Sequence, residues 1–328
     1  MISIRPATPE DVGLVLSFVR ELAEYERLLD DARSTEADLR AALFGEQPKV
    51  FCDLAQWEGR PVGFALWFYT FSTFKGRHGI YLEDLYVRPQ HRGRGIGRAL
   101  LADLAERCSR EGLARLEWAV LNWNAPSIAF YESLGARPLS EGSVYRLAGD
   151  ALKTNASQAT GHAQTRAPRS IRSAATDDTA VVHRLISEFA ESQRLAYEFE
   201  TSENVLRDAL FCERPTVFCD LAEWAGQPVG VALWIYSFST FNGRHGIFLE
   251  DLYVRPEHRR RGLGRALLAA LADRCIAEKL ARLEWGVGNW NTPSIAFYES
   301  IGAAPQGDWT VYRLTGDALQ NLAEREDA

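Results

Sequence analysis

The sequence has little that points to a membrane, a secretory route or nucleic acid. No apolar run approaches the roughly 20 residues of a transmembrane helix, and the first residues lack the basic and apolar segments of a secretory signal. The net charge is −7, whereas nucleic-acid binding favours a basic surface. We therefore expect no membrane and no nucleic acid as partners. The acidic balance suits a cationic small molecule, although acidity can also serve solubility alone.

Cysteine motifs and metal-ligand spacings are also missing. The chain has five cysteines, and no two of them form a Cys-x-x-Cys pair. An odd number of cysteines in apolar surroundings is typical of reduced, buried thiols in a cytoplasmic protein, so the cytoplasm is the expected compartment. His78 and His91, and their repeats His245 and His258, lie among arginines without ligand spacing. No metal is predicted.

The sequence is a duplication. RHGIYLEDLYVRP at Arg77 returns as RHGIFLEDLYVRP at Arg244, and NWNAPSIAFYESLGA at Asn122 returns as NWNTPSIAFYESIGA at Asn289, with one constant shift and no gap. A repeat this long is a whole domain rather than a solenoid unit, and 328 residues suit two domains. We predict copy one at residues 1–150, a linker at 151–169 and copy two at 170–328. A flexible tether of that length lets the copies pack as an intramolecular pseudo-dimer.

Apolar spacing and turn residues outline one copy. Thr8-Pro9-Glu10-Asp11 is typical of a helix start, and a second short helix is expected over residues 35–43. Three strands, a helix, a strand, a short helix and a last strand at residues 144–147 follow. This order predicts an α/β fold with two tandem domains, each a mixed β-sheet flanked by helices.

A glycine- and arginine-rich loop precedes the long helix in each copy. Residues 92–97 and 259–264 fit the pattern R-x-x-G-x-G between a strand and a helix. Glycines allow close backbone approach to a ligand, and a helix N-terminus attracts anions, so the loop is a candidate phosphate site. A dinucleotide fingerprint would need glycine at Arg98, and a Walker loop would need Gly-Lys-Ser/Thr. The alternative is a glycine-rich turn with solvated arginines.

Four motifs in order resemble one family. RELAEYE, YLEDLYV, RGRGIG and WNAPSIAFYESLGA are similar to motifs of the GNAT acetyltransferase superfamily, in its spermidine/spermine (diamine) acetyltransferase branch. The likeness covers residues 3–147 and, by the repeat, 170–314. It implies acetyl-CoA as co-substrate and direct ternary-complex transfer to the primary amine of a small diamine, polyamine or lysine-like amino acid such as thialysine. Acetylation of a protein lysine or N-terminus, and a non-catalytic acetyl-CoA sensor, remain alternatives.

The resemblance also implies catalytic roles. Tyr131 and Tyr298 match the tyrosine that protonates the departing thiolate, and Glu83 and Glu250 match the residue that draws the proton from the amine. An alkyl ammonium with a pKa near ~10.4 must lose that proton before it attacks. Regular alternation sends Glu83 and Asp84 to opposite faces unless a bulge intervenes. By position alone, the tyrosines could pack on the sheet and the carboxylates could be solvated strand ends.

By the same resemblance, binding residues can be assigned in both copies. Those expected to contact CoA in copy one are Leu85, Tyr86, Val87, Arg92, Gly93, Arg94, Gly95, Ile96, Gly97, Arg98, Asn124 and Ser127. Those expected in copy two are Leu252, Tyr253, Val254, Arg259, Arg260, Arg261, Gly262, Leu263, Gly264, Arg265, Asn291 and Ser294. Those expected to contact the acceptor amine are Tyr25, Glu26, Asp84, Glu117, Trp118, Asp251, Glu284 and Trp285.

The copies differ at one expected acceptor contact. Copy one has Tyr25-Glu26 after its first helix, where copy two has Ser192-Gln193. We expect copy two to bind acetyl-CoA and to handle a different acceptor, or to handle the same one poorly. Neutral drift on an exposed helix is the alternative. In the family, two subunits form the active sites at a dimer interface, so one copy is expected to complete the pocket of the other.

Overall fold

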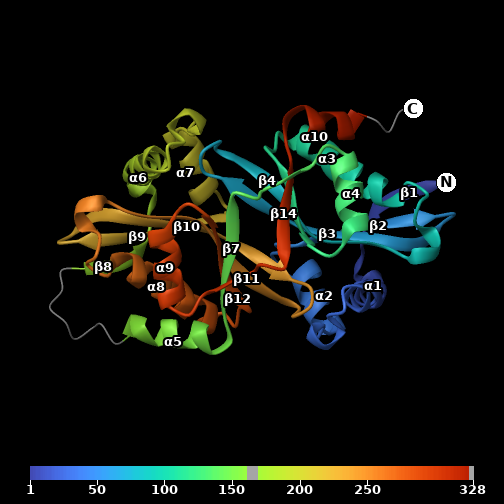
Figure 1. Ribbon diagram of the computed structural model, residues 1–328, viewed down its shortest axis with the longest axis horizontal. Helices are drawn as coiled ribbons and strands as arrows, with labels where there is room; N and C mark the ends of the chain where they lie inside the picture. The colour runs from blue at the N-terminus through green and yellow to red at the C-terminus, as the bar shows by residue number, and fades with distance from the viewer. Residues whose placement is uncertain (161–168, 325–328) are drawn as a thin grey trace.

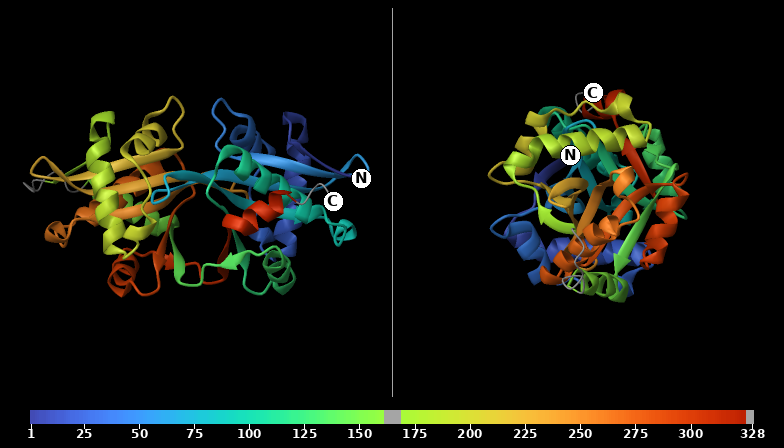
Figure 2. Two further views of the ribbon diagram at one scale, coloured as in Figure 1. Left: turned by 90° about the horizontal axis from the view of Figure 1, so that it is seen from above. Right: turned by 90° about the vertical axis from the view of Figure 1, so that its left-hand side faces the viewer.

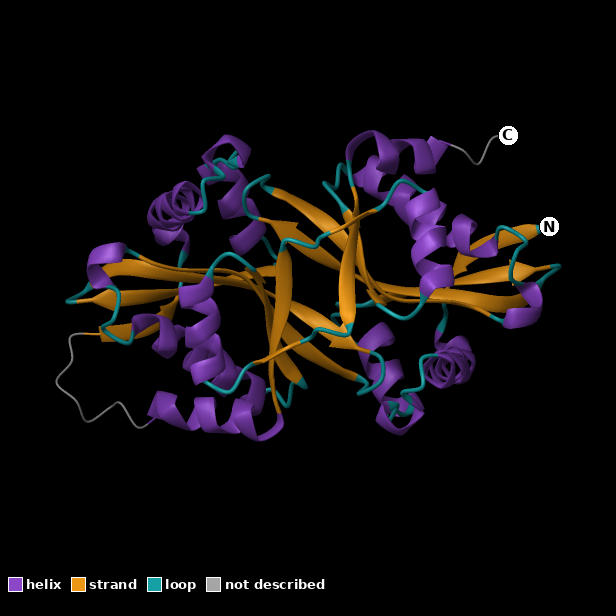
Figure 3. Cartoon of the chain, viewed as in Figure 1, coloured by secondary structure: helices purple, strands orange, loops and turns teal. Residues whose placement is uncertain are grey.

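The protein is described from a computed structural model that covers residues 1–160 and 169–324. Two halves lie end to end along the long axis (Figure 2), and helices flank the sheets of each half (Figure 3). Within these residues the strands form two sheets of seven. The expected fold class, two tandem mixed α/β domains, is confirmed.

The first sheet has the order β1-β2-β3-β4-β5-β14-β6. Its β4–β5 pairing is parallel and its other pairings are antiparallel. Its strands are β1 (Ile2–Pro6), β2 (Phe51–Trp57), β3 (Arg60–Ser72), β4 (Arg77–Val87), β5 (Leu116–Leu121), β14 (Trp309–Leu314) and β6 (Arg137–Pro138). The strand β1 is absent from the expected element order, because a five-residue edge strand carries little periodic signal.

The second sheet repeats this plan in the order β13-β7-β12-β11-β10-β9-β8. Its parallel pairing joins β11 to β12. Its strands are β13 (Ala304–Pro305), β7 (Gly142–Ala148), β12 (Arg282–Gly288), β11 (Arg244–Val254), β10 (Gln227–Ser239), β9 (Val217–Trp224) and β8 (Arg169–Ser173).

The copies exchange their last strands. The β7 strand of copy one pairs with β12 of copy two, and β14 of copy two pairs with β5 of copy one. Both strands run near the middle of the molecule, each into the opposite half (Figure 1). The two copies are therefore interlocked within one chain, which agrees with the expected pseudo-dimer and explains why the last strand of each copy lies far from its own sheet.

Helices cover the sheets in matched sets. Those of copy one are α1 (Val12–Tyr25), α2 (Glu36–Phe44), α3 (Ile96–Glu111), α4 (Ala125–Ser133) and α5 (Gly149–Thr160). Those of copy two are α6 (Thr179–Ser192), α7 (Glu203–Phe211), α8 (Leu263–Ala277), α9 (Thr292–Ser300) and α10 (Gly316–Ala323). The expected second helix is confirmed as α2, capped by Thr35. None of these helices combines the length and apolarity that a bilayer crossing requires.

The first part of the predicted linker is helical. Residues 151–160 belong to α5, because Leu152 and Ala156, one turn apart, are buried against the core around α8. In the same way α10, which comes directly after the exchanged strand β14, packs on α3 of copy one. The rest of the predicted linker, residues 161–168, lies outside the described residues. The domain boundaries at 1–150, 151–169 and 170–328 stay a prediction.

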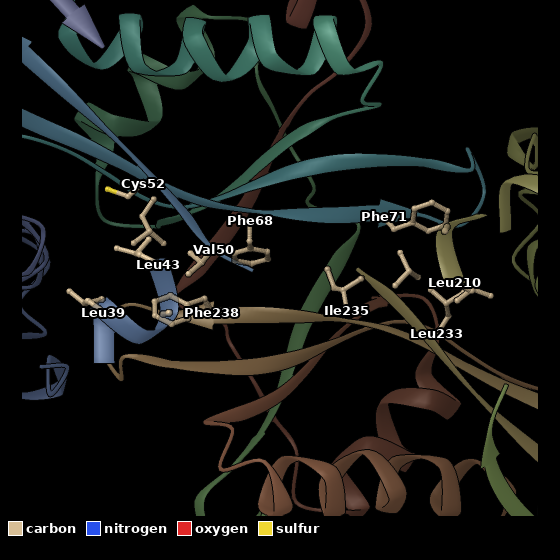
Figure 4. Packing of buried hydrophobic residues seen from close by; sticks show 14 of the residues in the cluster. Leu39, Leu43, Val50, Cys52, Phe68, Phe71, Leu210, Leu233, Ile235 and Phe238 are labelled. Atoms are coloured by element: carbon tan, nitrogen blue, oxygen red, sulfur yellow. The ribbon is translucent and has the colours of Figure 1, made fainter. Parts of the chain in front are cut away.

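One core joins the halves. It collects side chains from α1 and α2, from α6 and α7, and from the sheet faces that these helices cover. Phe68 and Phe71 of copy one belong to this cluster together with Ile235 and Phe238 of copy two (Figure 4). The tip of each long hairpin also bonds the other copy. Phe241 O accepts hydrogen bonds from Arg33 N–H and Ser34 N–H at 2.7 and 2.9 Å, and Phe74 O accepts from Glu200 N–H and Thr201 N–H at 2.7 and 3.1 Å.

Candidate active site

A β-bulge places Glu83. On β4, Asp84 pairs with Leu66 and Leu82 pairs with Trp67, so Glu83 is the extra residue. Both Tyr81 and Tyr86 pack on the core beneath α1, although regular alternation over five residues would send them to opposite faces. The bulge therefore brings Glu83 and Asp84 to one side of the sheet. The same shift occurs at Glu250 in β11.

Next to the bulge, β4 and β5 separate. Their parallel pairing ends at Leu82 with Trp118, and beyond it both strands line a cavity of about 1300 Å³. The predicted contact strand, Leu85 to Val87, forms one wall, and Ala119 forms part of the other. An unpaired strand edge can receive an extended ligand by main-chain hydrogen bonds.

The glycine- and arginine-rich loop leads into this cavity. Gly95 has φ of 83° and is the N-cap of α3 without a side-chain cap. A Cβ added at Gly93 would meet nothing within 4 Å, and one at Gly95 only Ile2 Cδ1 at 4.0 Å. The loop is therefore open above its backbone, and the helix N-terminus offers donors to an anion. These residues fit the diphosphate of acetyl-CoA.

Tyr131 lies on the cavity wall and is 8% exposed. Its ring packs on Trp118 at 4.8 Å and on Phe130 at 5.3 Å between ring centroids. Burial, and then the charge of Glu26, raises the pKa of Tyr131. The hydroxyl therefore keeps its proton at neutral pH, as a general acid must.

Tyr25 and Asn124 meet at the same wall. The Tyr25 hydroxyl donates to Asn124 Oδ1 at 3.0 Å, and Asn124 caps α4 by accepting from Ser127 N–H. The Arg92 guanidinium lies 4.6 Å from the centroid of the Tyr25 ring, a distance suited to a cation–π contact. The loop, the first helix and α4 are thus joined by direct side-chain contacts in copy one.

Among the carboxylates that line the cavity, Glu26, Glu83 and Asp84 belong to copy one and were predicted from the sequence. Burial, reinforced by the charge of Glu83, raises the pKa of Glu26 to about 7. Burial raises the pKa of Glu83, and it raises the pKa of Asp84 well above its ordinary value. Asp84 Oδ2 is buried and has no hydrogen-bond partner among the described residues. A cationic amine would compensate this group of negative charge.

The cavity also reaches into copy two, whose contribution includes Asn242 at the hairpin tip, Glu250, Arg282, Glu284 and Arg313. The predicted residues in its lining are Tyr25, Glu26, Glu83, Asp84, Leu85, Tyr86, Val87, Arg92, Gly93, Gly95, Ile96, Gly97, Arg98, Glu117, Asn124, Ser127, Tyr131, Glu250 and Glu284. The expectation that one copy contributes to the pocket of the other agrees with this lining.

Two chains of ion pairs cross the interface. In one, Arg146 bonds Glu284 at 2.7 Å, Glu284 bonds Arg282 at 2.6 Å, and Arg282 reaches Glu83 at 3.3 Å. In the other, Arg313, Glu117, Arg115 and Glu250 follow the same order at 2.7, 2.6 and 3.5 Å. Glu117 and Glu284, predicted to contact the acceptor, are thus each held by two arginines.

The sequence interpretation missed these four arginines. A signal was present, because Arg-x-Glu recurs at Arg115-Leu116-Glu117 and Arg282-Leu283-Glu284. In a strand, residues two apart share a face, so each arginine and glutamate could be expected to pair. Their partners in the other copy could not be read from this local pattern.

Copy two repeats the helix cap and the buried tyrosine of copy one. Asn291 caps α9, and Tyr298 packs on Trp285 at 4.8 Å between ring centroids. Burial raises the pKa of Tyr298 to about 12. Apart from Trp118 and Trp285, the remaining predicted residues outside the cavity lining are Arg94 of copy one and Asp251, Leu252, Tyr253, Val254, Arg259, Arg260, Arg261, Gly262, Leu263, Gly264, Arg265 and Ser294 of copy two.

Trp118 and Trp285 lie in the core and not in the cavity lining. Each is 1% exposed and supports a tyrosine ring from inside the core. Their assignment as acceptor contacts stays a prediction. In the part of the chain that the structure describes, no three His, Cys, Asp or Glu side chains are grouped to hold a metal ion.

Comparisons with known proteins agree with this geometry. A sequence model of the acetyltransferase (GNAT) family matches residues 17–136 and 182–303, once in each copy. A thialysine N-ε-acetyltransferase of Bos taurus is 40% identical over 163 residues, covering 46% of this chain and 95% of that protein. An L-ornithine N5-acetyltransferase of Arabidopsis thaliana is 29% identical over 195 residues, covering 46% and 86%. A solved tandem GNAT protein from the clavulanic acid biosynthesis pathway shares the fold, with a TM-score of 0.55, 21% identity and 96% and 98% coverage.

Proposed function

The chain belongs to the acetyltransferase (GNAT) family and is an N-acetyltransferase, and from this premise we propose its reaction. It transfers acetyl from acetyl-CoA to the primary amine of a small diamine, polyamine or lysine-like amino acid. The observation that carries the proposal is the copy-one cavity, which joins an open anion loop, an unpaired strand edge, Tyr131 and a group of carboxylates. The relatives named for thialysine and ornithine support an amine acceptor of this size.

Acetyl-CoA, when bound, would supply the acyl thioester. Loop residues 92–98 and the first turn of α3 would hold its diphosphate, and the β4 edge at residues 85–87 would hold the pantetheine arm. A backbone N–H of that edge would then stabilise negative charge at the reacting carbonyl. Asn124 and Ser127, at the start of α4, complete this side of the site.

The acceptor amine would enter against the carboxylates. Asp84 and Glu26 would hold its ammonium form, and Glu83 would accept the proton that the amine must lose before attack, directly or through a water. Tyr131 would give its proton to the departing sulfur. Because both partners are held in one cavity, the amine attacks the thioester directly and no acyl-enzyme is needed.

The other predicted properties stay proposals. We propose the cytoplasm as the compartment, in keeping with five free cysteines, four of them buried. We propose that the copy-two residues from Asp251 to Arg265, with Asn291, Ser294 and Tyr298, form a second acetyl-CoA site.

The test is turnover. The full chain is incubated with acetyl-CoA and a panel of diamines, polyamines, lysine-like amino acids and lysine peptides, and CoA release is followed with a thiol reagent. We expect turnover on the small amines. Release on peptides alone would replace the proposed acceptor class. Absence of binding by calorimetry at millimolar acetyl-CoA would overturn the proposal itself.

A further inference from the structure

An arginine of copy two contacts the proposed base of copy one. Arg282 Nη2 lies 3.3 Å from Glu83 Oε1 and donates to Phe238 O at 3.1 Å. Its Nε lies 2.6 Å from Glu284 Oε2. The Arg282 and Glu83 side chains are each 14% exposed, so bulk water screens the contact little.

The charges around Glu83 are mostly negative. Glu26 faces it from the C-cap of α1, Asp84 lies next to it on β4, and Glu284 faces it from β12. The Tyr81 hydroxyl on β4 is uncharged, because burial raises its pKa. The cations that oppose this negative charge at Glu83 are Arg282 and, further away, Arg146 of β7. Arg282 makes the direct contact, whereas Arg146 is bonded to Glu284.

We propose that Arg282 is a positioning residue for the reaction in copy one. It orients the Glu83 carboxylate and keeps it ionised, and therefore able to accept a proton, among the other carboxylates. Arg115 has the same relation to Glu250 at 3.5 Å. Each copy thus supplies the cation that prepares the base of the other. This inference rests on the proposed function, in which Glu83 is the base.

A fused pair then has a functional consequence. Arg282 is the first residue of β12. Glu284, two residues further along this strand, is bonded by Arg146 of the exchanged strand β7. Copy two therefore contributes to catalysis in copy one whether or not copy two turns over its own acceptor. Drift at Ser192-Gln193 leaves this contribution intact, because Ser192 ends α6, Gln193 is its C-cap, and neither residue belongs to the ion-pair chain.

The test measures copy one alone. Tyr298→Phe serves as the parent, and Arg282→Gln and Arg282→Lys are added to it. Glutamine can still donate to Glu83 and to Phe238 O but has no charge. We expect Arg282→Gln to move the acid limb of kcat/KM upward by ~1 pH unit, since an opposite charge at this range lowers a carboxyl pKa by about 1–3 units. Above that limb kcat/KM should recover most of the parent value, and Arg282→Lys should stay within about 0.3 of a pH unit of the parent limb.

A matched control is available within the chain. Arg115→Gln in the same parent removes an equally buried arginine that faces Glu250 instead of Glu83, and its acid limb should move by less than half as much. The amine acceptor is the same throughout, so its own ionisation cancels in these comparisons. If Arg282→Gln does not fold, Arg282→Gln with Glu284→Gln keeps the buried net charge, and we expect a smaller upward shift.

A second readout does not need turnover. The side-chain carboxyl of Glu83 is followed by 13C NMR titration and assigned with Glu83→Gln, and its midpoint should rise in Arg282→Gln. Loss of activity at every pH without a midpoint change, or equal shifts for Arg115→Gln, would leave Arg282 a purely structural residue. A midpoint that rises in a protein without amine turnover would support the contact and overturn the proposed function instead.

Discussion

Copy one and copy two differ on both sides of the reaction centre. On the acceptor side, copy one has Tyr25 and Glu26, and the Tyr25 hydroxyl bonds Asn124. At these positions copy two has Ser192 and Gln193, and the Ser192 hydroxyl donates to Phe189 O and accepts from Gln193 Nε2. The bulge, the tyrosine and the ion-pair chain are present in both copies.

The hairpin tips add to this difference. Asn242 of copy two lines the copy-one cavity, whereas its equivalent in copy one, Lys75, reaches toward copy two and bonds Glu200 at 2.8 Å. On the acceptor side, copy two has therefore lost the Glu26 carboxylate, whereas the Lys75 cation is paired with Glu200, which stands where copy one has Arg33.

The proposed CoA-binding loops also differ between the copies. In copy two Arg260 replaces Gly93, and Arg169 replaces Ile2. Arg169 Nη1 bonds Arg261 O at 3.3 Å and lies 2.6 Å from the position of a Cβ on Gly262. Copy two has thus gained cations at its anion loop. From this comparison we propose that the fused copies have diverged toward different roles, with acceptor chemistry in copy one and stronger CoA binding in copy two.

The largest expected effect separates the two tyrosines. Tyr131→Phe should lower CoA release with a diamine by ~100-fold, the range of general acid catalysis, while Tyr298→Phe should change it less than twofold. Steady-state rates with a thiol reagent measure both. Equal losses would show that both copies share the diamine reaction and that the divergence has no catalytic meaning.

Next in size is the acceptor pair. Tyr25→Ser with Glu26→Gln gives copy one the copy-two residues, and kcat/KM for a diamine should fall by ~10-fold, because a charged contact near ~1.4 kcal/mol is lost. The reverse graft, Ser192→Tyr with Gln193→Glu, is measured in a Tyr131→Phe background. A gain in diamine turnover there would localise the difference to these positions, and no gain would point to the hairpin tips instead.

The hairpin tip gives a smaller effect. Asn242→Lys gives the copy-one cavity a cation equivalent to Lys75. KM for a diamine should then rise by ~5-fold, which is the scale of a partly screened charge repulsion. Asn242→Gln, which adds length without charge, is the control. A similar rise for both variants would indicate a steric cause.

The sequence predicts the local parts of this molecule well. The loop and α3 depend on residues close together in the chain, and turn residues and periodicity report such features, while the duplication is visible when the sequence is aligned with itself. Whether a bulge occurs at Glu83 could not be decided from the sequence, because it depends on how Leu66 and Trp67 of β3 pair with β4.

The exchanged strands and the ion-pair chains could not be predicted from the sequence, for a physical reason. A strand pattern at residues 142–148 is the same whichever sheet receives it, so local residues do not choose between its own copy and the other. One clue was overlooked: Gly149-Asp150-Ala151-Leu152 recurs as Gly316-Asp317-Ala318-Leu319. The repeat therefore extends into α5 and α10, and the segment read as linker begins inside the fold.

On the CoA side, Arg169→Ile should weaken acetyl-CoA binding by copy two about threefold, since a single exposed cation near a phosphate contributes less than ~1 kcal/mol. Ile2→Arg should strengthen binding by copy one to a similar degree. Two-site calorimetry in Tyr131→Phe, at low and high salt, measures both, and the gain should shrink as salt screens the charge. Unchanged affinity in both variants would contradict the proposal that copy two is specialised for CoA binding.

The smallest effect concerns Arg260, which has φ of 59° where copy one has Gly93 at 72°. A left-handed conformation strains a side-chain-bearing residue by ~1–2 kcal/mol, and glycine regains part of this while adding freedom to the unfolded chain. Arg260→Gly should therefore raise the free energy of unfolding by ~0.5 kcal/mol and weaken acetyl-CoA binding by copy two. Arg260→Ala removes the charge but keeps most of the strain, so urea denaturation and calorimetry on both variants separate the two effects. A rise in stability with unchanged affinity would mean that the strained arginine does not serve the anion loop.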